Sequence, residues 1–191
     1  MPFFQFETDA KPSYGGMIRH IPHLLKNLEK TSAIYPACPY PAISKSLQIF
    51  NQIQVVSDPK KNIIVIASDA QSRLDSEAAS AVYHSNGWKV SHLGDMSSSI
   101  NVLFDLDFQK LIGKIWKQKS GILVIVVFSK TDEGLNFFAD SINPIIEKSG
   151  KQMKLALCGK VSKKTKIRSD LTSEKIEDIL QWSQTVSENI K

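Results

Sequence analysis

The side chains that could bind a metal or take part in catalysis are few in this sequence and widely spaced. His20 and His23 lie three residues apart, a spacing that would place both imidazoles on one helix face and suit a metal or a heme iron. Pro22 lies between them and disturbs that geometry, and no second pair of ligands follows at a motif spacing. The alternative is that both histidines lie at a surface or an interface. Cys38 precedes Pro39, and this Cys-Pro dipeptide is a weak signal for a heme-thiolate regulatory site.

The remaining reactive side chains do not form a catalytic motif. The sequence lacks paired carboxylates, a nucleophile elbow, a phosphate-binding loop and a metal-binding cluster. His84 and His92 are isolated in the sequence, and a lone histidine is usually structural. Cys38 and Cys158 are too few for a disulfide scaffold, and both are expected to be free thiols. We therefore do not expect an enzyme.

Length and composition are ordinary for a globular protein. The 191 residues, 42% of them hydrophobic, suffice for one domain with an appendage or for two small domains. The longest apolar run, residues 122–128, is too short to cross a bilayer, so no membrane partner is expected. The amino terminus has no basic segment leading into an apolar one, and a cytoplasmic location is expected.

Much of the net charge of +5 lies in one patch near the carboxyl end, formed by Lys160, Lys163, Lys164, Lys166 and Arg168. This patch is either a solvated loop or a contact surface for an acidic partner, nucleic acid included. No aromatic residue is interleaved with these lysines, and no helix-turn-helix or zinc-finger spacing occurs. Nucleic acid is therefore expected only as an indirect partner.

One unit of strand, helix and strand is the clearest structural pattern in the sequence. Residues 63–67 form a short β-branched run typical of a buried parallel strand, and they end in a polar loop at residues 68–72. A helix is expected from about residue 75 to residue 85, because small apolar side chains recur there at spacings of three and four. Asn86-Gly87 should end this helix. Residues 88–93 alternate like a second strand, which predicts a right-handed crossover unit.

Strands and helices continue to alternate along the rest of the chain. Residues 122–128, apolar on both faces, predict a central strand, and residues 154–158 predict a fourth strand. Helices are expected at residues 102–119, at residues 135–148 with an interruption near Pro144, and after a capping box at Thr172 or Ser173. The alternation predicts an α/β fold, a doubly wound parallel sheet with the flavodoxin-like strand order 2-1-3-4 and an optional fifth strand.

Residues 1–59 differ from the rest of the chain because they contain seven of its eight prolines. Between these prolines only short helices fit, at residues 18–28 and 43–55. We expect residues 1–59 to form a helical or irregular appendage to the main domain, residues 60–191. The appendage would pack on the main domain or on a second copy of the chain, and in the second case it would form a homodimer.

Several short motifs follow one another along residues 60–186. They are Asp69-Ala70-Gln71-Ser72-Arg73-Leu74, Asn86-Gly87-Trp88-Lys89-Val90, Leu93-Gly94, Ser129-Lys130-Thr131, Cys158-Gly159 and Ser169-Asp170. Their order resembles the cobalamin-binding (B12-binding) domain of corrinoid methyltransferases, mutases and cobalamin-dependent regulators. The resemblance implies a flavodoxin-like Rossmann fold and a tetrapyrrole cofactor.

The sequence departs from this family at the residue that would bind cobalt. The family motif Asp-x-His-x-x-Gly supplies a histidine as the lower ligand, and the corresponding residue here is Gln71. An amide is a poor substitute for an imidazole as a metal donor, so methyl-transfer or radical chemistry is not expected. Leu74 and Lys160 replace two family glycines. In these respects the chain is similar to divergent regulators, among them light and redox antirepressors, that bind heme or have a reworked pocket.

The loss of the histidine leaves two possibilities for a bound tetrapyrrole. A cobalamin would keep its own base or water as lower ligand, whereas a heme would need an axial donor from elsewhere in the chain. The available donors are His20, His23, His84, His92 and Cys38. His92 lies nearest in sequence to a ligand loop and is the candidate metal ligand. Strand alternation also places His92 on the same face as Trp88 and Val90, where it would instead be buried in packing.

The loops that follow the strands should converge at one edge of a doubly wound sheet, and ligands of such sheets bind there. We therefore expect the cofactor to contact Asp69, Gln71, Ser72, Gly94, Ser97, Ser129, Thr131 and Gly159. The expected function is a sensory or regulatory module that holds cobalamin or heme and signals to a regulatory protein partner. A ligand-free protein-interaction domain without a cofactor is the alternative, and a corrinoid-dependent enzyme subunit is a third.

Overall fold

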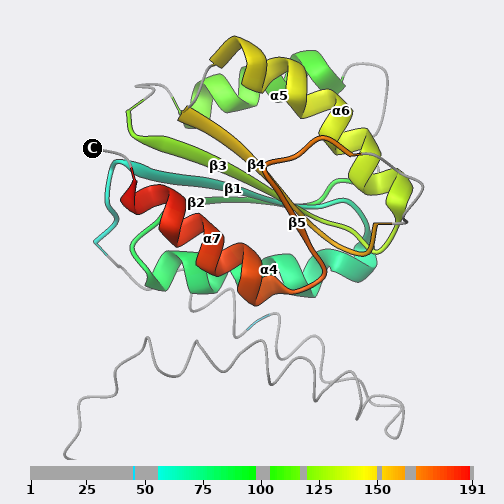
Figure 1. Ribbon diagram of the computed structural model, residues 1–191, viewed down its shortest axis with the longest axis horizontal. Helices are drawn as coiled ribbons and strands as arrows, with labels where there is room; N and C mark the ends of the chain where they lie inside the picture. The colour runs from blue at the N-terminus through cyan, green and yellow to red at the C-terminus, as the bar shows by residue number, and fades with distance from the viewer. Residues whose placement is uncertain are drawn as a thin grey trace, which may run out of the picture.

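The computed structural model describes Lys45 and residues 56–97, 104–116, 120–149, 152–161 and 167–189. In chain order the elements are β1 (Lys61–Ala67), the short 3-10 helix η1 (Ala70–Ser72), α4 (Arg73–Ser85), β2 (Lys89–Asp95), α5 (Phe104–Ile115), β3 (Ile122–Phe128), α6 (Asp132–Ser149), β4 (Met153–Cys158), β5 (Leu171–Ser173) and α7 (Ile176–Glu188) (Figure 1). Apart from Lys45, the predicted helices at residues 18–28 and 43–55 lie outside the described residues, as do His20, His23 and Cys38. Within the ranges given above, no helix is long and apolar enough to cross a membrane.

The five described strands form one parallel sheet in the order β2-β1-β3-β4-β5. This order confirms the predicted doubly wound sheet and the interior positions predicted for residues 63–67 and 122–128. Every residue of β3 is buried, and so is every residue of β1 after Lys61. Because both faces of these strands are covered, their sequences are continuous apolar runs and do not alternate.

Helices cover both faces of the sheet (Figure 1). On one face, α5 and α6 bury Phe108 and Phe138 against β1, β3 and β4. On the other face, α4 and α7 contribute Ala79 and Ile179, both fully buried, to a second core cluster. The sheet therefore lies between two separate apolar layers, and its carboxyl edge is formed by the loops that lead from the strands into the helices.

A buried pair of hydroxyl groups joins the two helices of the second layer. The Tyr83 hydroxyl of α4 and the Ser183 hydroxyl of α7 form a hydrogen bond of 2.8 Å. The Tyr83 ring also packs edge-to-face on Trp88, with the ring centroids 5.5 Å apart. Burial raises the pKa of Tyr83 well above its ordinary value, so the hydroxyl is neutral. This contact connects α4 to α7 across a sequence separation of 100 residues.

The end of α4 follows the sequence prediction. Asn86 is the C-cap residue, and Gly87 after it has a φ of 77°, in the left-handed region that glycine adopts without strain. β2 begins at Lys89, one residue later than expected, and Trp88 is buried in the layer beneath α4. The start of α4 at Arg73 is two residues earlier than predicted, directly after η1.

The interruption near Pro144 that was predicted for the helix at residues 135–148 is wrong. α6 runs without a break from Asp132 to Ser149 and contains Pro144. Proline removes one intrahelical hydrogen bond and usually kinks or ends a helix. Here Pro144 is exposed, while Ile142 and Ile145 on either side of it are buried in the core. The burial of both neighbours keeps the two halves of the helix on the same sheet face.

The capping box predicted at Thr172 or Ser173 is also wrong. Both residues lie in β5, where they pair with Leu157 and Cys158 of β4. α7 begins at Ile176, and its N-cap residue, Lys175, forms no capping bond through its side chain. Strand pairing has taken the residues that the local pattern assigned to the helix start, and it adds a fifth strand to the sheet.

Candidate functional site

The candidate site is the edge at which all five described parallel strands end. The chain passes from β1 outward to β2 and then returns to β3 on the other side of β1, so β1 and β3 flank the switch point of the sheet. Main-chain hydrogen bonds of 2.8 to 3.0 Å join adjoining loops at this edge. They run from Ser68 N–H to Phe128, from Met96 N–H to Ala67, from Ser129 N–H to Cys158 and from Gly159 N–H to Ser173. The predicted convergence of these loops is therefore present.

Asp69 joins the two loops at the switch point. Asp69 is the N-cap residue of η1, and its Oδ1 accepts hydrogen bonds from the N–H (2.8 Å) and the hydroxyl (2.7 Å) of Ser72. Its Oδ2 accepts from the hydroxyls of Ser68 (3.0 Å) and Ser129 (3.1 Å) and from the Lys130 N–H (2.9 Å). A carboxylate has about four lone-pair sites. The acceptor capacity of Asp69 is therefore filled by the protein's own donors.

The ionisation of Asp69 reflects these contacts. Partial burial acts to raise the pKa of Asp69, but the Lys130 N–H, the hydroxyl and N–H of Ser72 and the Ser68 hydroxyl together outweigh it. The result is a pKa below the ordinary value for an aspartate. Asp69 is therefore an anion at neutral pH, and it holds the β1 and β3 loops together as one.

Ser129 and Thr131 connect the end of β3 to the start of α6. The Ser129 side chain lies 2.9 Å from the Thr131 carbonyl, and the Gly134 N–H donates to the Thr131 hydroxyl oxygen over 3.1 Å. This cap explains why α6 begins at Asp132 and not near residue 135, as predicted. A Cβ atom on Gly134 would lie only 2.5 Å from Ser129 Oγ and 2.6 Å from Ser68 Oγ. The first turn of α6 is thus closed against both loops of the switch point.

Gly159 brings the loop after β4 into direct contact with the loop after β3. A Cβ atom on Gly159 would lie 2.3 Å from the Ser129 carbonyl oxygen and 3.1 Å from Leu135 Cδ1. Real Cβ atoms do not approach a backbone oxygen so closely, because packed interiors leave no room for the overlap. Only glycine fits between these two loops as they stand.

An irregularity in β2 shapes the fourth loop of the site. Val65 pairs with His92 and Ile66 pairs with Gly94, so Leu93 is an additional residue in the ladder. Gly94 has a φ of 69° and has open space around its Cα, so glycine is needed there for its backbone conformation. Beyond it, Ser97 is exposed, and its N–H donates to the Asp95 carboxylate over 2.9 Å.

Seven of the eight predicted site residues fall into two groups, and the eighth, Gly94, is half-buried in β2, where it contributes its backbone conformation. An inner group is engaged in contacts between the loops and consists of Asp69, Ser72, Ser129 and Gly159. An outer group lies at the edge with its side chains exposed and consists of Gln71, Ser97 and Thr131. An ion pair between Lys130 Nζ and Asp75 Oδ2, 2.7 Å long, adds a link from the β3 loop to α4.

His92 is half-buried and faces α4. Its Nε2 lies 3.0 Å from the Ser76 hydroxyl, on the sheet face where Trp88 is buried. Burial lowers the pKa of His92; the charge of Glu77 opposes this shift, and that of Arg73 adds to it. The imidazole is therefore neutral at pH 7. This arrangement matches the packing alternative that strand alternation indicated for His92.

Three residues with structural roles at this edge were not singled out from the sequence: Ser68, Lys130 and Gly134. Their contacts cross from one loop to another, and spacing along the chain does not reveal such contacts. One signal was present, because Gly134 directly precedes the helix predicted from residue 135. In the structure it lies in the first turn of α6, where glycine costs helix stability. A glycine retained at that cost indicates a close approach.

The strand order, the two helical layers and the four loops at the switch point define a flavodoxin-like α/β domain of the kind that binds its ligand at the carboxyl edge. No protein-family model matches the chain, and no curated protein matches it in sequence. Solved structures do match. One is the monomethylamine corrinoid protein of Methanosarcina barkeri, with 16% identity and a TM-score of 0.52 over 78% of this chain and 64% of that chain.

A second similar structure is a cobalamin-binding protein from Desulfitobacterium hafniense. It has 10% identity and a TM-score of 0.52, and the similarity covers 91% of this chain and 96% of that chain. This chain spans less than two thirds of the length of the Methanosarcina protein. The two similarities identify the fold as that of cobalamin-binding domains, and they confirm the fold that the order of the sequence motifs implied.

The described residues include few donors for a metal ion near the carboxyl edge. No group of three or more His, Cys, Asp or Glu side chains in these ranges is placed to hold a metal ion. Burial raises the pKa of the Cys158 thiol to about 12, so it is not a thiolate at neutral pH. His92 is engaged with Ser76, and Gln71 offers an amide. A corrinoid can carry its own lower ligand, whereas a heme depends on donors of this kind.

Proposed function

We propose that this chain is a cytoplasmic regulatory module that binds a cobalamin at the carboxyl edge of its sheet and signals to a protein partner. The observation that carries the proposal is the position of Gln71. It is exposed on η1, two residues after Asp69, where the motif of the similar family has its cobalt-binding histidine. The protein would hold the cobalamin through its loops and leave the lower ligand to the cofactor's own base or to water.

The residues of the edge have distinct roles in this proposal. Gln71, Ser97 and Thr131 offer exposed amide and hydroxyl groups that can bind the polar side chains of a corrin ring. Asp69 fixes the spacing of the β1 and β3 loops on which the ring would lie. A bound cobalamin would supply a cobalt centre whose axial ligation responds to light, redox state or a metabolite. The ion pair of Lys130 with Asp75 would pass a movement of the β3 loop to α4.

A ligand-free interaction domain is the second candidate function, and one observation favours it. The hydrogen bonds of Asp69 span the switch point, and the first turn of α6 is closed against Ser68 and Ser129. An edge closed in this way can remain stable without a cofactor. The two candidates differ in one simple property, because a bound tetrapyrrole colours the protein.

The first experiment is retention of colour. The full chain is incubated in separate samples with hydroxocobalamin and with heme, and free cofactor is removed by gel filtration. We expect cobalamin absorbance to elute with the protein in stoichiometric amount, and no Soret band in the heme sample. Loss of cobalamin on the column would contradict the proposal and favour the ligand-free domain.

Replacing Gln71 with histidine is expected to change the ligand of cobalt without abolishing binding. In the wild type, the nitrogen hyperfine splitting in the EPR spectrum of the reduced cob(II)alamin form should not change when the protein is labelled with ¹⁵N-histidine, because no protein nitrogen binds cobalt. In Gln71→His it should change, because imidazole is a strong donor and amide is not.

Gln109→His is the matched control, since Gln109 is an exposed glutamine on α5. Its spectrum should remain that of the wild type. A wild-type spectrum that already responds to ¹⁵N-histidine would show that a histidine of the chain binds cobalt, and it would overturn the assignment of Gln71 as a non-coordinating residue.

A further inference from the structure

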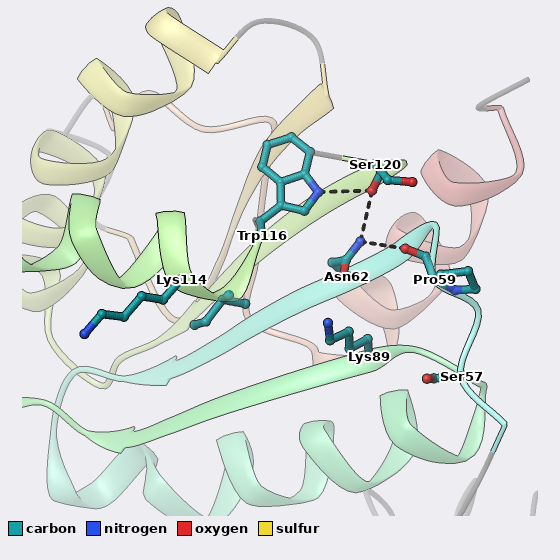
Figure 2. A pocket seen from close by; sticks show the side chains of 8 residues that line it. Ser57, Pro59, Asn62, Lys89, Lys114, Trp116 and Ser120 are labelled. Atoms are coloured by element: carbon teal, nitrogen blue, oxygen red, sulfur yellow. Dashed lines mark hydrogen bonds between the residues drawn. The ribbon is translucent and has the colours of Figure 1, made fainter. Parts of the chain in front are cut away.

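A second concave site lies at the opposite edge of the sheet, where the strands begin (Figure 2). Its volume is about 520 Å³, within the range of about 300 to 1,000 Å³ that small-molecule sites occupy. The lining residues are Ser57, Pro59, Asn62, Lys89, Lys114, Ile115, Trp116 and Ser120. We call this the amino-edge pocket, and it is separate from the loops described above.

The wall of the amino-edge pocket is built by two buried polar side chains. Asn62 is 4% exposed, and its Nδ2 donates to the carbonyls of Pro59 and Ser120, each over 3.2 Å. Trp116 is 5% exposed, and its Nε1 donates to the Ser120 carbonyl over 3.0 Å. Figure 2 shows how these bonds hold the segment before β3 against the start of β1. The backbone acceptors of the wall are thus occupied, and the wall is fixed in advance of binding.

The charged groups that remain on the lining are cationic. Within the described part of the chain, neither Lys89 nor Lys114 forms an ion pair or a side-chain hydrogen bond. Lys60, directly before β1, is exposed, and Asp58 is the acidic residue of the segment 56–62. Asp58 accepts a hydrogen bond from the backbone N–H of Lys60. The lining therefore combines two ammonium groups that have no ion-pair partner among the described residues with hydroxyl donors, an arrangement complementary to an anion.

The two lysines differ in what the fold itself requires of them. Lys114 lies in the last turn of α5, where a cation also complements the partial negative charge of the helix end. Lys89 begins β2 beside Asn62, to which it is paired in the sheet, and it has no helix end to neutralise. Figure 2 shows the Lys89 side chain below Asn62, with its ammonium end directed away from Ser57. Lys89 is the stronger indication of a ligand.

We propose that the amino-edge pocket binds a small phosphorylated metabolite, with its phosphate at Lys89 and the rest of the molecule toward Ile115 and Lys114. A phosphate monoester carries a charge between about −1.5 and −2 at neutral pH, more than one carboxylate. Lysine binds phosphate as a compact point charge, and the Ser57 and Ser120 hydroxyls add donors. The inference is independent of cobalamin binding, because it concerns the other edge of the sheet.

The test uses inorganic phosphate and pyrophosphate as probes of the full chain. The chain has three tryptophans, and only Trp116 belongs to the lining, while Trp88 and Trp182 serve as internal references. We expect pyrophosphate to cause a saturable shift of the Trp116 indole signal in a ¹H–¹⁵N NMR spectrum and little change in the other two. Sodium chloride at the same ionic strength should not reproduce the shift.

Substitutions test whether Lys89 and Lys114 are responsible for pyrophosphate binding. Lys89→Gln and Lys114→Gln should each weaken binding about tenfold, the loss expected for one charge-assisted contact. Lys110→Gln, an exposed residue of α5 outside the lining, removes the same charge and should change affinity less than about twofold. Thermal melting of each variant confirms folding. No saturable shift at Trp116, or an equal loss in Lys110→Gln, would overturn the proposal.

Discussion

We expect the free energy of unfolding of an Asp69→Ala variant to be about 3 kcal/mol lower than that of the wild type. The reason is that a charged acceptor is lost and several buried donors lose their partner. The donors come from Ser68, Ser72, Ser129 and Lys130, on both sides of the switch point. Urea unfolding of the full chain measures the difference. Cobalamin retention should fall with it, since the two loops would no longer be held at one spacing.

The matched control is Asp95→Ala. Asp95 is exposed, and its carboxylate accepts a hydrogen bond from the N–H of Ser97 within its own loop. Its removal should change the free energy of unfolding by no more than about 0.5 kcal/mol. Equal losses of unfolding free energy in the two variants would mean that the hydrogen bonds of Asp69 between the loops do not stabilise the fold more than a local contact does.

The pH dependence of stability gives a second test of Asp69. Its folded pKa is lowered, so its stabilising contribution is fully present above the pKa of an unfolded aspartate, about 3.9, and is lost as the pH falls through the lower folded value. An Asp69→Asn variant lacks this titration. The gap in unfolding free energy between wild type and variant should therefore be constant near neutral pH and should narrow in acid below about pH 4. A constant gap down to the acid transition would contradict this role.

A Gly159→Ala variant is expected to lose about 3 kcal/mol of stability, because the new methyl group must displace backbone. Its nearest neighbour would be the Ser129 carbonyl oxygen, at 2.3 Å. A flexible side chain could turn away, but a backbone carbonyl directly after a central strand cannot do so without moving β3 or β4. Thermal and urea unfolding measure the effect.

Gly113→Ala is the control of opposite sign. Gly113 lies in α5, and a Cβ atom built on it would meet no atom within 4 Å. Alanine should stabilise the helix there by about 0.5 to 1 kcal/mol, since glycine is the poorer helix former. If Gly159→Ala were as well tolerated as Gly113→Ala, the loops after β3 and β4 would have to be more separable than the structure shows.

The sheet could be predicted from the sequence because the residue types of its central strands show that both faces of these strands are buried. The runs at residues 63–67 and 122–128 are apolar on both faces, and only interior parallel strands require that pattern. Asn86-Gly87 likewise marked the end of α4 through a local conformational need. Features that are determined by residues adjacent in the sequence could therefore be predicted.

Features that are determined by packing between segments distant in the sequence could not be predicted. Pro144 should end a helix, yet the burial of its neighbours keeps α6 continuous. Thr172 and Ser173 form a strand because β4 offers them an edge to pair with. At the site, the motif pattern indicated Asp69, Ser129 and Gly159. It did not show that the Ser129 hydroxyl bonds Asp69, or that Gly159 packs directly against the Ser129 carbonyl, so that these residues close the edge between the loops.

The position of α7 in the chain has a consequence for how the protein is synthesised. α7 contributes Ile179 and Ser183 to the layer beneath the sheet, and the Ser183 hydroxyl satisfies the buried Tyr83 hydroxyl 100 residues earlier. While the chain is still being synthesised, the apolar side of β1 and β3 lacks this cover until α7 has emerged from the ribosome. The nascent domain therefore passes through a stage in which it exposes an apolar surface that is prone to aggregation. Chaperone binding during translation would protect it at that stage.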